Sequence, residues 1–425
     1  MRRLSLLGLA LLGALALSIP GAFAKSDSTV GTTAAPGVTA GSIKIGGTFP
    51  LTGAASLYGT IPAAMRAYFS YVNATKGPDG KRGVFGRQIN WVYYDDVYNP
   101  ANSVQLTRRL VQQDRVFAVV GSLGTEVNLA IRPYLNAAKV PQLFPASGAE
   151  TFARDWKRFP WTNAWFPDYV SEGLIYGRHI RQNHADAKIG VIYQNDDYGK
   201  DMVYGLKVGL GKGKSNIVSE QPYEVTSTDP RSQIARLRAS GATVLVIILT
   251  PRATIQSYAI ARALNWRPTQ IYTNQVSGTD TFLTTARAAG AGDLVDGTIS
   301  IQYQKDPANP AWANDPAVKL YRTIMSRYFP NGSNPAVQAN GINYYGVSVA
   351  SSFVQLLRKA GPNPTRDGIL RAARSWNQVS PFLLPNNPQR TTVKNQFPIR
   401  GFRMVRFNNG TFTYISPMIY PRGQT

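Results

Sequence analysis

The chain has 425 residues, of which 46 are Lys or Arg and 23 are Asp or Glu, so its formal net charge is +23. The basic residues are scattered without a run of five, which is typical of a solvated surface and argues against a nucleic-acid partner. The chain has no cysteine, and at this length it buries enough core to need no disulfides. The length predicts two or three domains.

The first residues have the pattern of an export signal. Arg2 and Arg3 precede an apolar run that ends at Ile19, and Ala22-Phe-Ala24 is a small-residue cleavage site. We therefore expect a signal peptide over residues 1–24, whose removal lowers the net charge by two, to +21. The apolar run is too short for a lasting membrane span. Because no cysteine offers a lipid-attachment point, the expected location is the periplasm of a double-membraned bacterium.

Residues 25–42 consist largely of Ser, Thr, Ala, Gly and Pro and predict a flexible leader. Strand and helix signals then alternate. The first series comprises a strand at 43–49, a helix at 60–75, a strand at 86–96, a helix opening at Asn99-Pro100, a strand at 116–120, a helix at 126–138 and a strand at 140–144.

A second series of similar length begins at Lys188. It comprises strands at 189–193, 217–225, 244–249, 270–274 and 297–303. Between them we expect a loop at 195–199 followed by a helix to about 210, and helices at 231–240, 253–264 and 279–289. Further helices are expected at 316–328, 342–360 and 366–375, then a Pro-rich crossing at 381–398 and a hairpin of strands 403–407 and 411–415.

Two such series predict an α/β fold of two doubly wound parallel-sheet lobes. The late helices must return to the first lobe and the hairpin to the second, so the chain crosses three times and forms a three-strand hinge beside a cleft. The expected division is residues 43–163 plus 300–381 for lobe 1 and 164–299 plus 382–425 for lobe 2.

Short motifs in a fixed order carry a resemblance to a known family. They include Pro50-Leu-Thr-Gly53, Tyr94-Asp-Asp96, Val120-Gly-Ser-Leu-Gly-Thr125, Ala146-Ser-Gly-Ala149 and Asn195-Asp-Asp-Tyr-Gly199. The chain resembles the branched-chain amino-acid-type (type I) periplasmic solute-binding proteins of ABC transporters, the leucine/isoleucine/valine-binding family. The resemblance implies that a small-molecule ligand sits between two lobes, which close and then dock on a membrane permease.

The loop from Ser122 to Thr125 ends a strand and starts a helix, where free N–H groups and the helix dipole suit a carboxylate or carbonyl oxygen. The plain alternative is that Thr125 only caps the helix. In the resembled family this loop grips the ligand carboxylate, which implies ligand roles for Ser122 and Thr125. Ser147 and Ala149 match the family's second ligand loop.

Tyr58 and Tyr198 match family positions where an aromatic side chain lines the pocket from each lobe, and Tyr344 or Tyr345 is a further candidate. Amino-acid binders of the family place a carboxylate on the second lobe to pair with the ligand ammonium, whereas this chain has Asn274 and Gln275 there. Amides cannot neutralise an ammonium, and an unpaired buried ammonium is costly. We therefore expect a ligand other than a standard α-amino acid, unless Glu126 or Glu150 supplies the charge.

Enzymatic chemistry is not expected, because the sequence shows neither a nucleophile elbow nor a cofactor loop. The pairs Asp95-Asp96 and Asp196-Asp197 are interpreted as loop caps, and His179 and His184 as surface residues of a polar helix. Neither a metal nor a cofactor is expected, and the protein is expected to be a monomer. The alternatives are a ligand sensor of the amide-sensor type, which passes its bound state to a regulator, and an enzyme on a doubly wound fold.

Overall fold

The computed structural model describes residues 35–227 and 229–423. The predicted signal peptide and residues 25–34 of the predicted leader lie outside these ranges. The described part of the leader contacts the first strand, because the Lys44 N–H donates to the Gly37 carbonyl (2.7 Å) and Thr39 N–H to the Ser42 carbonyl (2.9 Å). Among the described residues, no helix has both the length and the apolar character that crossing a bilayer requires.

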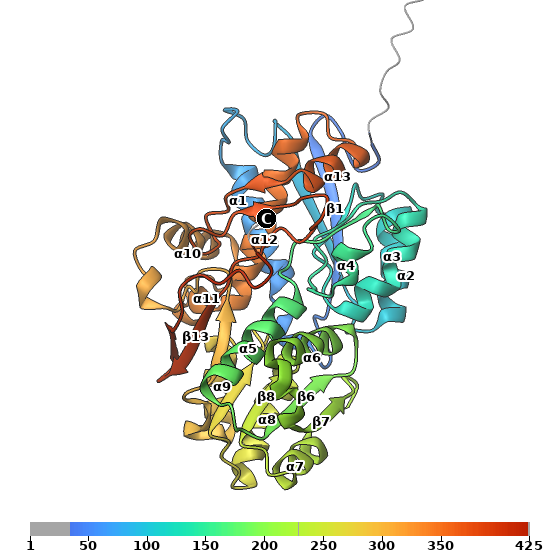
Figure 1. Cartoon of the computed structure of the whole chain (residues 1–425). Helices are drawn as coiled ribbons and strands as arrows, with labels where there is room; N and C mark the ends of the chain where they lie inside the picture. Colours follow the sequence, from blue (N-terminus) through green and yellow to red (C-terminus); the bar gives the residue numbers. More distant parts are fainter. Residues whose placement is uncertain (1–34, 228, 424–425) are drawn as a thin grey trace, which may run out of the picture. The chain divides into compact units, whose positions relative to one another are not determined.

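The described chain forms two separate α/β lobes (Figure 1). The first lobe contains a parallel five-stranded sheet of order β2-β1-β3-β4-β5. Its strands are β1 (Ser42–Phe49), β2 (Gln88–Asp95), β3 (Val119–Val120), β4 (Gln142–Leu143) and β5 (Thr162–Asn163). The two strands predicted over 116–120 and 140–144 are therefore present but short.

Helices from both ends of the chain complete the first lobe. They are α1 (Ile61–Ala74), α2 (Pro100–Gln112), α3 (Thr125–Ala137), α4 (Thr151–Arg154), α10 (Pro316–Tyr328), α11 (Pro335–Ala339), α12 (Gly341–Ala360) and α13 (Arg366–Arg374). Helix α12 packs on α1 and on α13, so the late helices return to the first lobe, as the sequence predicts. The predicted helix opening at Asn99-Pro100 is also confirmed, since the Asn99 side chain accepts from the Ala101 N–H (2.9 Å).

The second lobe contains a seven-stranded sheet of order β14-β13-β10-β9-β8-β6-β7. Its strands are β6 (Ile189–Gln194), β7 (Ile217–Tyr223), β8 (Val244–Ile248), β9 (Gln270–Thr273), β10 (Ile299–Gln302), β13 (Arg403–Asn408) and β14 (Thr411–Tyr414). The first five are parallel, and the C-terminal hairpin adds β13 antiparallel to β10. The chain thus leaves this sheet after Gln302, two residues beyond the start of the predicted return segment.

In the described part of the second lobe the helices are α5 (Tyr169–Asn183), α6 (Asp197–Leu210), α7 (Arg231–Ala239), α8 (Pro251–Ala263) and α9 (Asp280–Ala286). Helix α9 continues from Ala286 into a further helical turn, which ends where Ala289 and Gly290 leave helical geometry, close to the end of the helix predicted over 279–289. Short helical turns are η1 (Ser56–Tyr58), η2 (Gly211–Asn216), η3 (Arg287–Ala291), η4 (Gly292–Val295) and η5 (Pro310–Trp312), and a small third sheet pairs β11 (Asn377–Gln378) with β12 (Gln389–Arg390).

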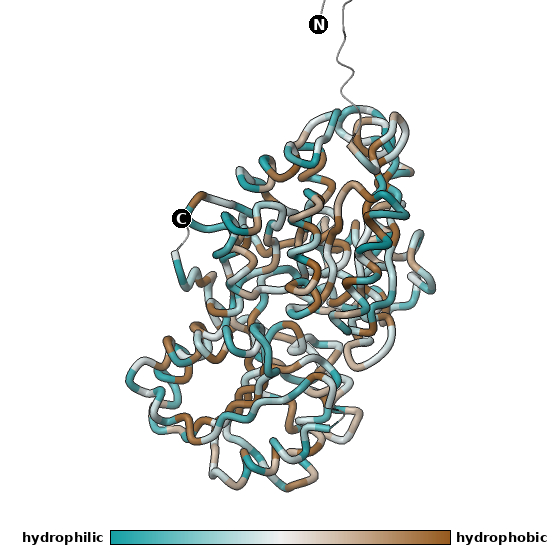
Figure 2. Tube along the Cα trace, turned by 90° about the vertical axis from the view of Figure 1, so that its right-hand side faces the viewer, coloured by the Kyte–Doolittle hydropathy of each residue, from teal (hydrophilic) through white to brown (hydrophobic). Residues whose placement is uncertain are grey.

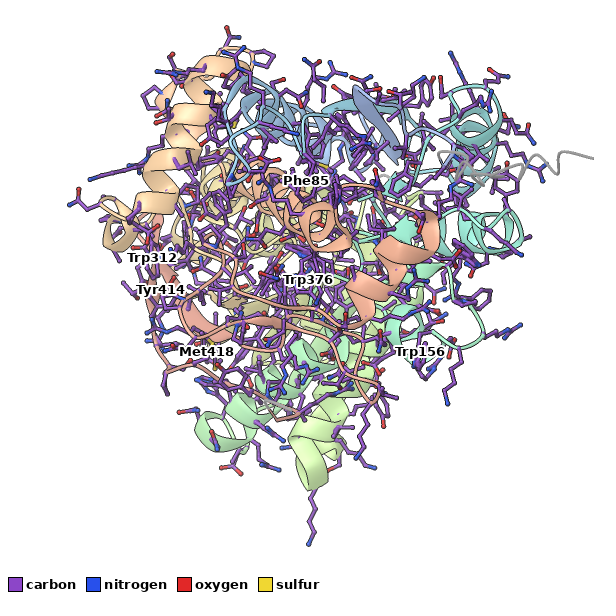
Figure 3. The ribbon with its side chains drawn as sticks, turned by 90° about the horizontal axis from the view of Figure 1, so that it is seen from above. Phe85, Trp156, Trp312, Trp376, Tyr414 and Met418 are labelled. Atoms are coloured by element: carbon purple, nitrogen blue, oxygen red, sulfur yellow. The ribbon has the colours of Figure 1, made fainter. Side chains whose placement is uncertain are left out.

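Apolar residues run along the interior strands and the inner faces of the helices (Figure 2). Every residue of β8 is buried, as an unbroken apolar run in a parallel sheet predicts. The C-terminal hairpin is tied to the segment that leads away from the second sheet: Trp312 and Tyr414 lie side by side in Figure 3, and the indole N–H donates to the tyrosine hydroxyl (2.9 Å).

Candidate ligand-binding site

A cavity of about 650 Å³, part of it open to solvent, lies where the carboxyl ends of both sheets meet. Its lining residues follow strands of the first lobe (Tyr98 after β2, Leu123 after β3) and of the second (Tyr198 after β6, Tyr303 after β10). The lining is rich in aromatic side chains: Tyr58, Tyr98, Phe166, Tyr169, Tyr198, Tyr303 and Tyr345. This is the edge at which doubly wound sheets bind ligands.

None of the described side chains that line this cavity is an acid, a lysine, an arginine or a histidine. Burial raises the pKa of Tyr58, Tyr98 and Tyr198 well above that of a free phenol, so their hydroxyls are neutral at physiological pH. The cavity therefore offers apolar ring surface, hydroxyls and main-chain groups. A ligand carboxylate held here would be bound by N–H and O–H donors without a counter-ion.

The start of helix α3 supplies such donors. Gly124 is its N-cap residue and no side chain caps the helix, so its first N–H groups have no side-chain partner. The capping role considered for Thr125 is wrong: this residue is the first of the helix, and its hydroxyl pairs with that of Ser147 (2.7 Å). Thr125 and Gly124 both line the cavity.

Tyr98 reaches the cavity because the loop after β2 turns sharply. Val97 and Tyr98 adopt left-handed backbone (φ +56° and +59°), and the carboxylates of Asp95 and Asp96 accept from their N–H groups (both 2.9 Å). This confirms the interpretation of the Asp pair as a loop cap. The Tyr98 ring then lies over Gly124, whose φ of +110° suits glycine and where a Cβ would meet the ring at 2.6 Å.

Tyr58 and Tyr198, predicted as pocket residues, both line the cavity. The Tyr58 hydroxyl donates across the cleft to the Val276 carbonyl (3.0 Å), and its ring packs edge-on against Phe282 (6.2 Å between centroids). With its amide nitrogen turned to the Ile247 carbonyl, Asn274 accepts from the Tyr198 hydroxyl (2.6 Å). Asn274 is buried behind the tyrosine and does not line the cavity.

Three other predicted residues, Ser122, Ser147 and Ala149, also lie behind the lining. The Ser122 hydroxyl accepts from the Thr48 N–H (3.0 Å) and so joins the ends of β3 and β1. The Ser147 hydroxyl holds Thr125 and accepts from the Ala149 N–H (3.2 Å). Direct ligand contact by these three residues stays a prediction. Thr125 lines the cavity and is supported from behind by Ser147.

Gln275, the remaining predicted residue, lines the cavity and is held by a carboxyl group that sequence reasoning missed. Glu172 on α5 is 2% exposed, and its Oε1 accepts from the Gln275 N–H (2.6 Å) and the Tyr176 hydroxyl (2.8 Å). Burial raises the pKa of Glu172 to about 8. The Gln275 amide nitrogen is buried without a partner among the described residues, so it has a hydrogen bond to give.

The structure shows which of the remaining candidate residues reach the cavity. Tyr345 lines the cavity, while Tyr344 packs on Tyr321 (5.0 Å between centroids) and donates to the Phe382 carbonyl (3.2 Å). Glu126 and Glu150 do not line the cavity, and Glu150 pairs with Arg422 (2.7 Å).

Like His184, His179 is partly buried, so the surface reading holds only in part. Its Nδ1 lies 2.7 Å from the Tyr272 hydroxyl, and burial lowers its pKa to about 4. The reading of Asp196 as a cap is confirmed, because its carboxylate accepts from the Gly199 N–H at the start of α6 (3.1 Å). Within residues 35–227 and 229–423, no three His, Asp or Glu side chains gather as a metal site requires.

Sequence reasoning missed several lining residues, chiefly Tyr98, Phe166, Tyr169 and Tyr303. A usable signal existed for Tyr303, because it ends the predicted strand 297–303 at the same sheet edge as Gln275. No comparable signal existed for Tyr98, since the left-handed turn that aims it is not a motif of the sequence.

Known proteins share this architecture. The model of the periplasmic binding protein family matches residues 42–411. Leu/Ile/Val-binding protein homolog 2 of Brucella abortus (strain 2308) is 23% identical over 350 residues, which cover 81% of this chain and 85% of the relative. The fatty acid ABC transporter substrate-binding protein from Thermomonospora curvata has a TM-score of 0.76 at 21% identity, over 92% of this chain and 96% of the other.

A third comparison is the solute-binding protein of an ABC transporter from Rhodopseudomonas palustris BisB5, solved in complex with 3,4-dihydroxybenzoic acid. Its TM-score is 0.72 at 18% identity, over 89% of this chain and 98% of the other. The fold agrees with these comparisons, because it consists of two doubly wound lobes with a cavity at their facing edges. The family match covers most of the described chain. The chain belongs to the periplasmic binding protein family, as a type I protein of its branched-chain amino-acid group.

Proposed function

We propose that this periplasmic protein captures a small organic solute between its lobes and delivers it to the membrane permease of an ABC importer. The observation that carries the proposal is the uncharged, aromatic cavity that both lobes line. Two cross-cleft hydrogen bonds support closure over a guest: Tyr58 hydroxyl to the Val276 carbonyl (3.0 Å) and Glu150 N–H to the Asp201 carboxylate (2.8 Å). The relatives named above are likewise binding proteins rather than enzymes.

The lining favours a carboxylate or amide with an apolar body over a standard α-amino acid. An α-ammonium in this cavity would meet no charged partner among the lining residues, and leaving it unpaired is costly. A carboxylate or carbonyl oxygen would find the N–H groups at the start of α3 and the Thr125 hydroxyl. The structural neighbours named above include a fatty acid ABC transporter substrate-binding protein and a solute-binding protein in complex with 3,4-dihydroxybenzoic acid, and both ligands belong to this class.

Ligand binding is expected to compact the protein, because a guest that contacts both lobes stabilises the closed state. A thermal-shift screen over benzoate-type acids, medium-chain fatty acids, short amides and leucine selects binders, and small-angle scattering then measures the radius of gyration with and without them. A decrease with an acid or amide is expected. Unchanged dimensions with a ligand that calorimetry shows to bind would contradict closure, and tight leucine binding would contradict the ligand class.

Thr125→Val is expected to weaken binding of such an acid about tenfold, since it removes one hydroxyl at the carboxylate end while keeping the side-chain shape. Isothermal titration calorimetry measures the change. Thr323→Val, on the exposed face of α10, serves as the control and should bind as the unaltered protein does. An affinity that Thr125→Val leaves unaltered would remove this residue from the site.

A further inference from the structure

A second, polar compartment of about 400 Å³ adjoins the aromatic cavity. The two share a wall made of Gln275, Thr279, Tyr303, Gln304 and Gly341. The far side of the new compartment is formed by the first residue of α9, Asp280, and by Asp306 after β10. A molecule in the aromatic cavity could therefore extend into a space of different chemistry.

Asp280 and Asp306 are buried carboxyl groups without a cation. They are 8% and 6% exposed, and neither forms an ion pair with any described residue. Lys305 also lines this compartment, but its ammonium is engaged with Asp315 (2.6 Å). Burial raises the pKa of Asp306 to about 6, and burial together with the charge of Asp306 raises that of Asp280 well above its usual value. A cation placed beside such buried carboxyl groups stabilises their ionised form strongly.

Asp306 accepts hydrogen bonds from the Ala308 N–H (2.9 Å) and the Gln302 side-chain amide (3.2 Å), but other polar groups at this wall lack partners among the described residues. The Tyr303 side chain is 3% exposed and lines both compartments, yet its hydroxyl forms no hydrogen bond with a described residue. The amide nitrogen of Gln275 and the amide oxygen of Gln304 are buried and equally unpartnered within the described chain. Buried polar groups in native structures are nearly always satisfied, so these groups have hydrogen-bonding capacity to offer a ligand.

We propose that the protein binds an extended ligand whose apolar body occupies the aromatic cavity and whose far end is a primary ammonium seated between Asp280 and Asp306. This deepens the proposed function and rests on it. An ammonium brings three donors, which match the two carboxylates and the Gln304 oxygen. An α-amino acid carries its ammonium one carbon from its carboxylate and so cannot place the two groups in separate compartments.

Three benzoates of equal tail length test the proposal: 4-butylbenzoate, 4-(3-hydroxypropyl)benzoate and 4-(3-aminopropyl)benzoate. Calorimetry on the full protein is expected to show the aminopropyl acid binding at least about tenfold tighter than the butyl acid, because hydrogen bonds to charged groups are worth that much. Asp280→Asn and Asp306→Asn should each reduce this preference at least about tenfold while binding of the butyl acid persists. That persistence also shows that the variants fold.

Asp197→Asn is the matched control, because Asp197 occupies the same position in α6 as Asp280 does in α9 but is exposed and outside both compartments. It should keep the full preference. Equal affinities of the butyl and aminopropyl acids, or a preference that persists in both asparagine variants, would contradict ammonium binding between Asp280 and Asp306. The proposed function would still stand. If none of the acids and amides tested bound or compacted the protein, the proposed function would be contradicted, and the ammonium site between Asp280 and Asp306 with it.

Discussion

Gly205→Ala is expected to lower the free energy of unfolding by about 3 kcal/mol and to weaken ligand binding as well. Gly205 lies on α6, where a Cβ would come nearer than 3.0 Å to the Val170 carbonyl oxygen of α5. Backbone cannot swing aside as a flexible side chain does, so the helices must separate. Three further glycines in this contact, Gly173, Gly177 and Gly209, meet opposing backbone in the same way.

Separation of α5 and α6 would reach the site, because their first turns carry Tyr169 and Tyr198. These two rings line the cavity with their centroids 4.8 Å apart. Urea denaturation followed by circular dichroism measures stability, and calorimetry with the best ligand measures binding. Gly213→Ala in the turn after α6 is the control, since a Cβ there meets nothing within 4 Å. A Gly205→Ala protein as stable as the control would show that α5 and α6 can move apart without lowering the free energy of unfolding.

The doubly wound plan follows from sequence patterns that are local. The residues of β8 form one buried apolar run, and Asn408-Asn-Gly410 connects the final hairpin. Such signals depend on period and turn chemistry, which a single chain displays directly. The assignment of the hairpin to the second lobe also followed from the sequence, whereas its pairing with β10 did not.

The binding site was less predictable, because its residues are brought together by the fold. Thr125 and Gln275 stand directly after strands, and the strand-end rule places them at the shared edge. The partners that fix them do not show in the sequence. Glu172 looks like an ordinary helix glutamate, although it is buried under Gln275. Asp280 and Asp306 are likewise separate in the sequence, and only the fold brings them to one compartment.

The buried carboxyl group of Glu172 makes the stability of the protein depend on pH. The pKa of Glu172 is about 8 in the folded protein and about 4.3 in an unfolded chain, so the folded state holds the proton more tightly. Its contribution to stability is therefore fully present below about pH 4.3 and is lost as the pH rises through about 8. Glu172→Gln cannot ionise and should lack this loss.

Relative to the unaltered protein, Glu172→Gln is accordingly expected to gain at least about 2 kcal/mol of unfolding free energy between pH 5 and pH 9, measured by urea denaturation at each pH. Glu224→Gln, an exposed change on the same lobe, should show no such gain. A pH-independent difference would mean that Glu172 stays ionised in the folded protein. It would then be a fixed negative charge behind Gln275, and the second lobe could attract a ligand cation at the aromatic cavity after all.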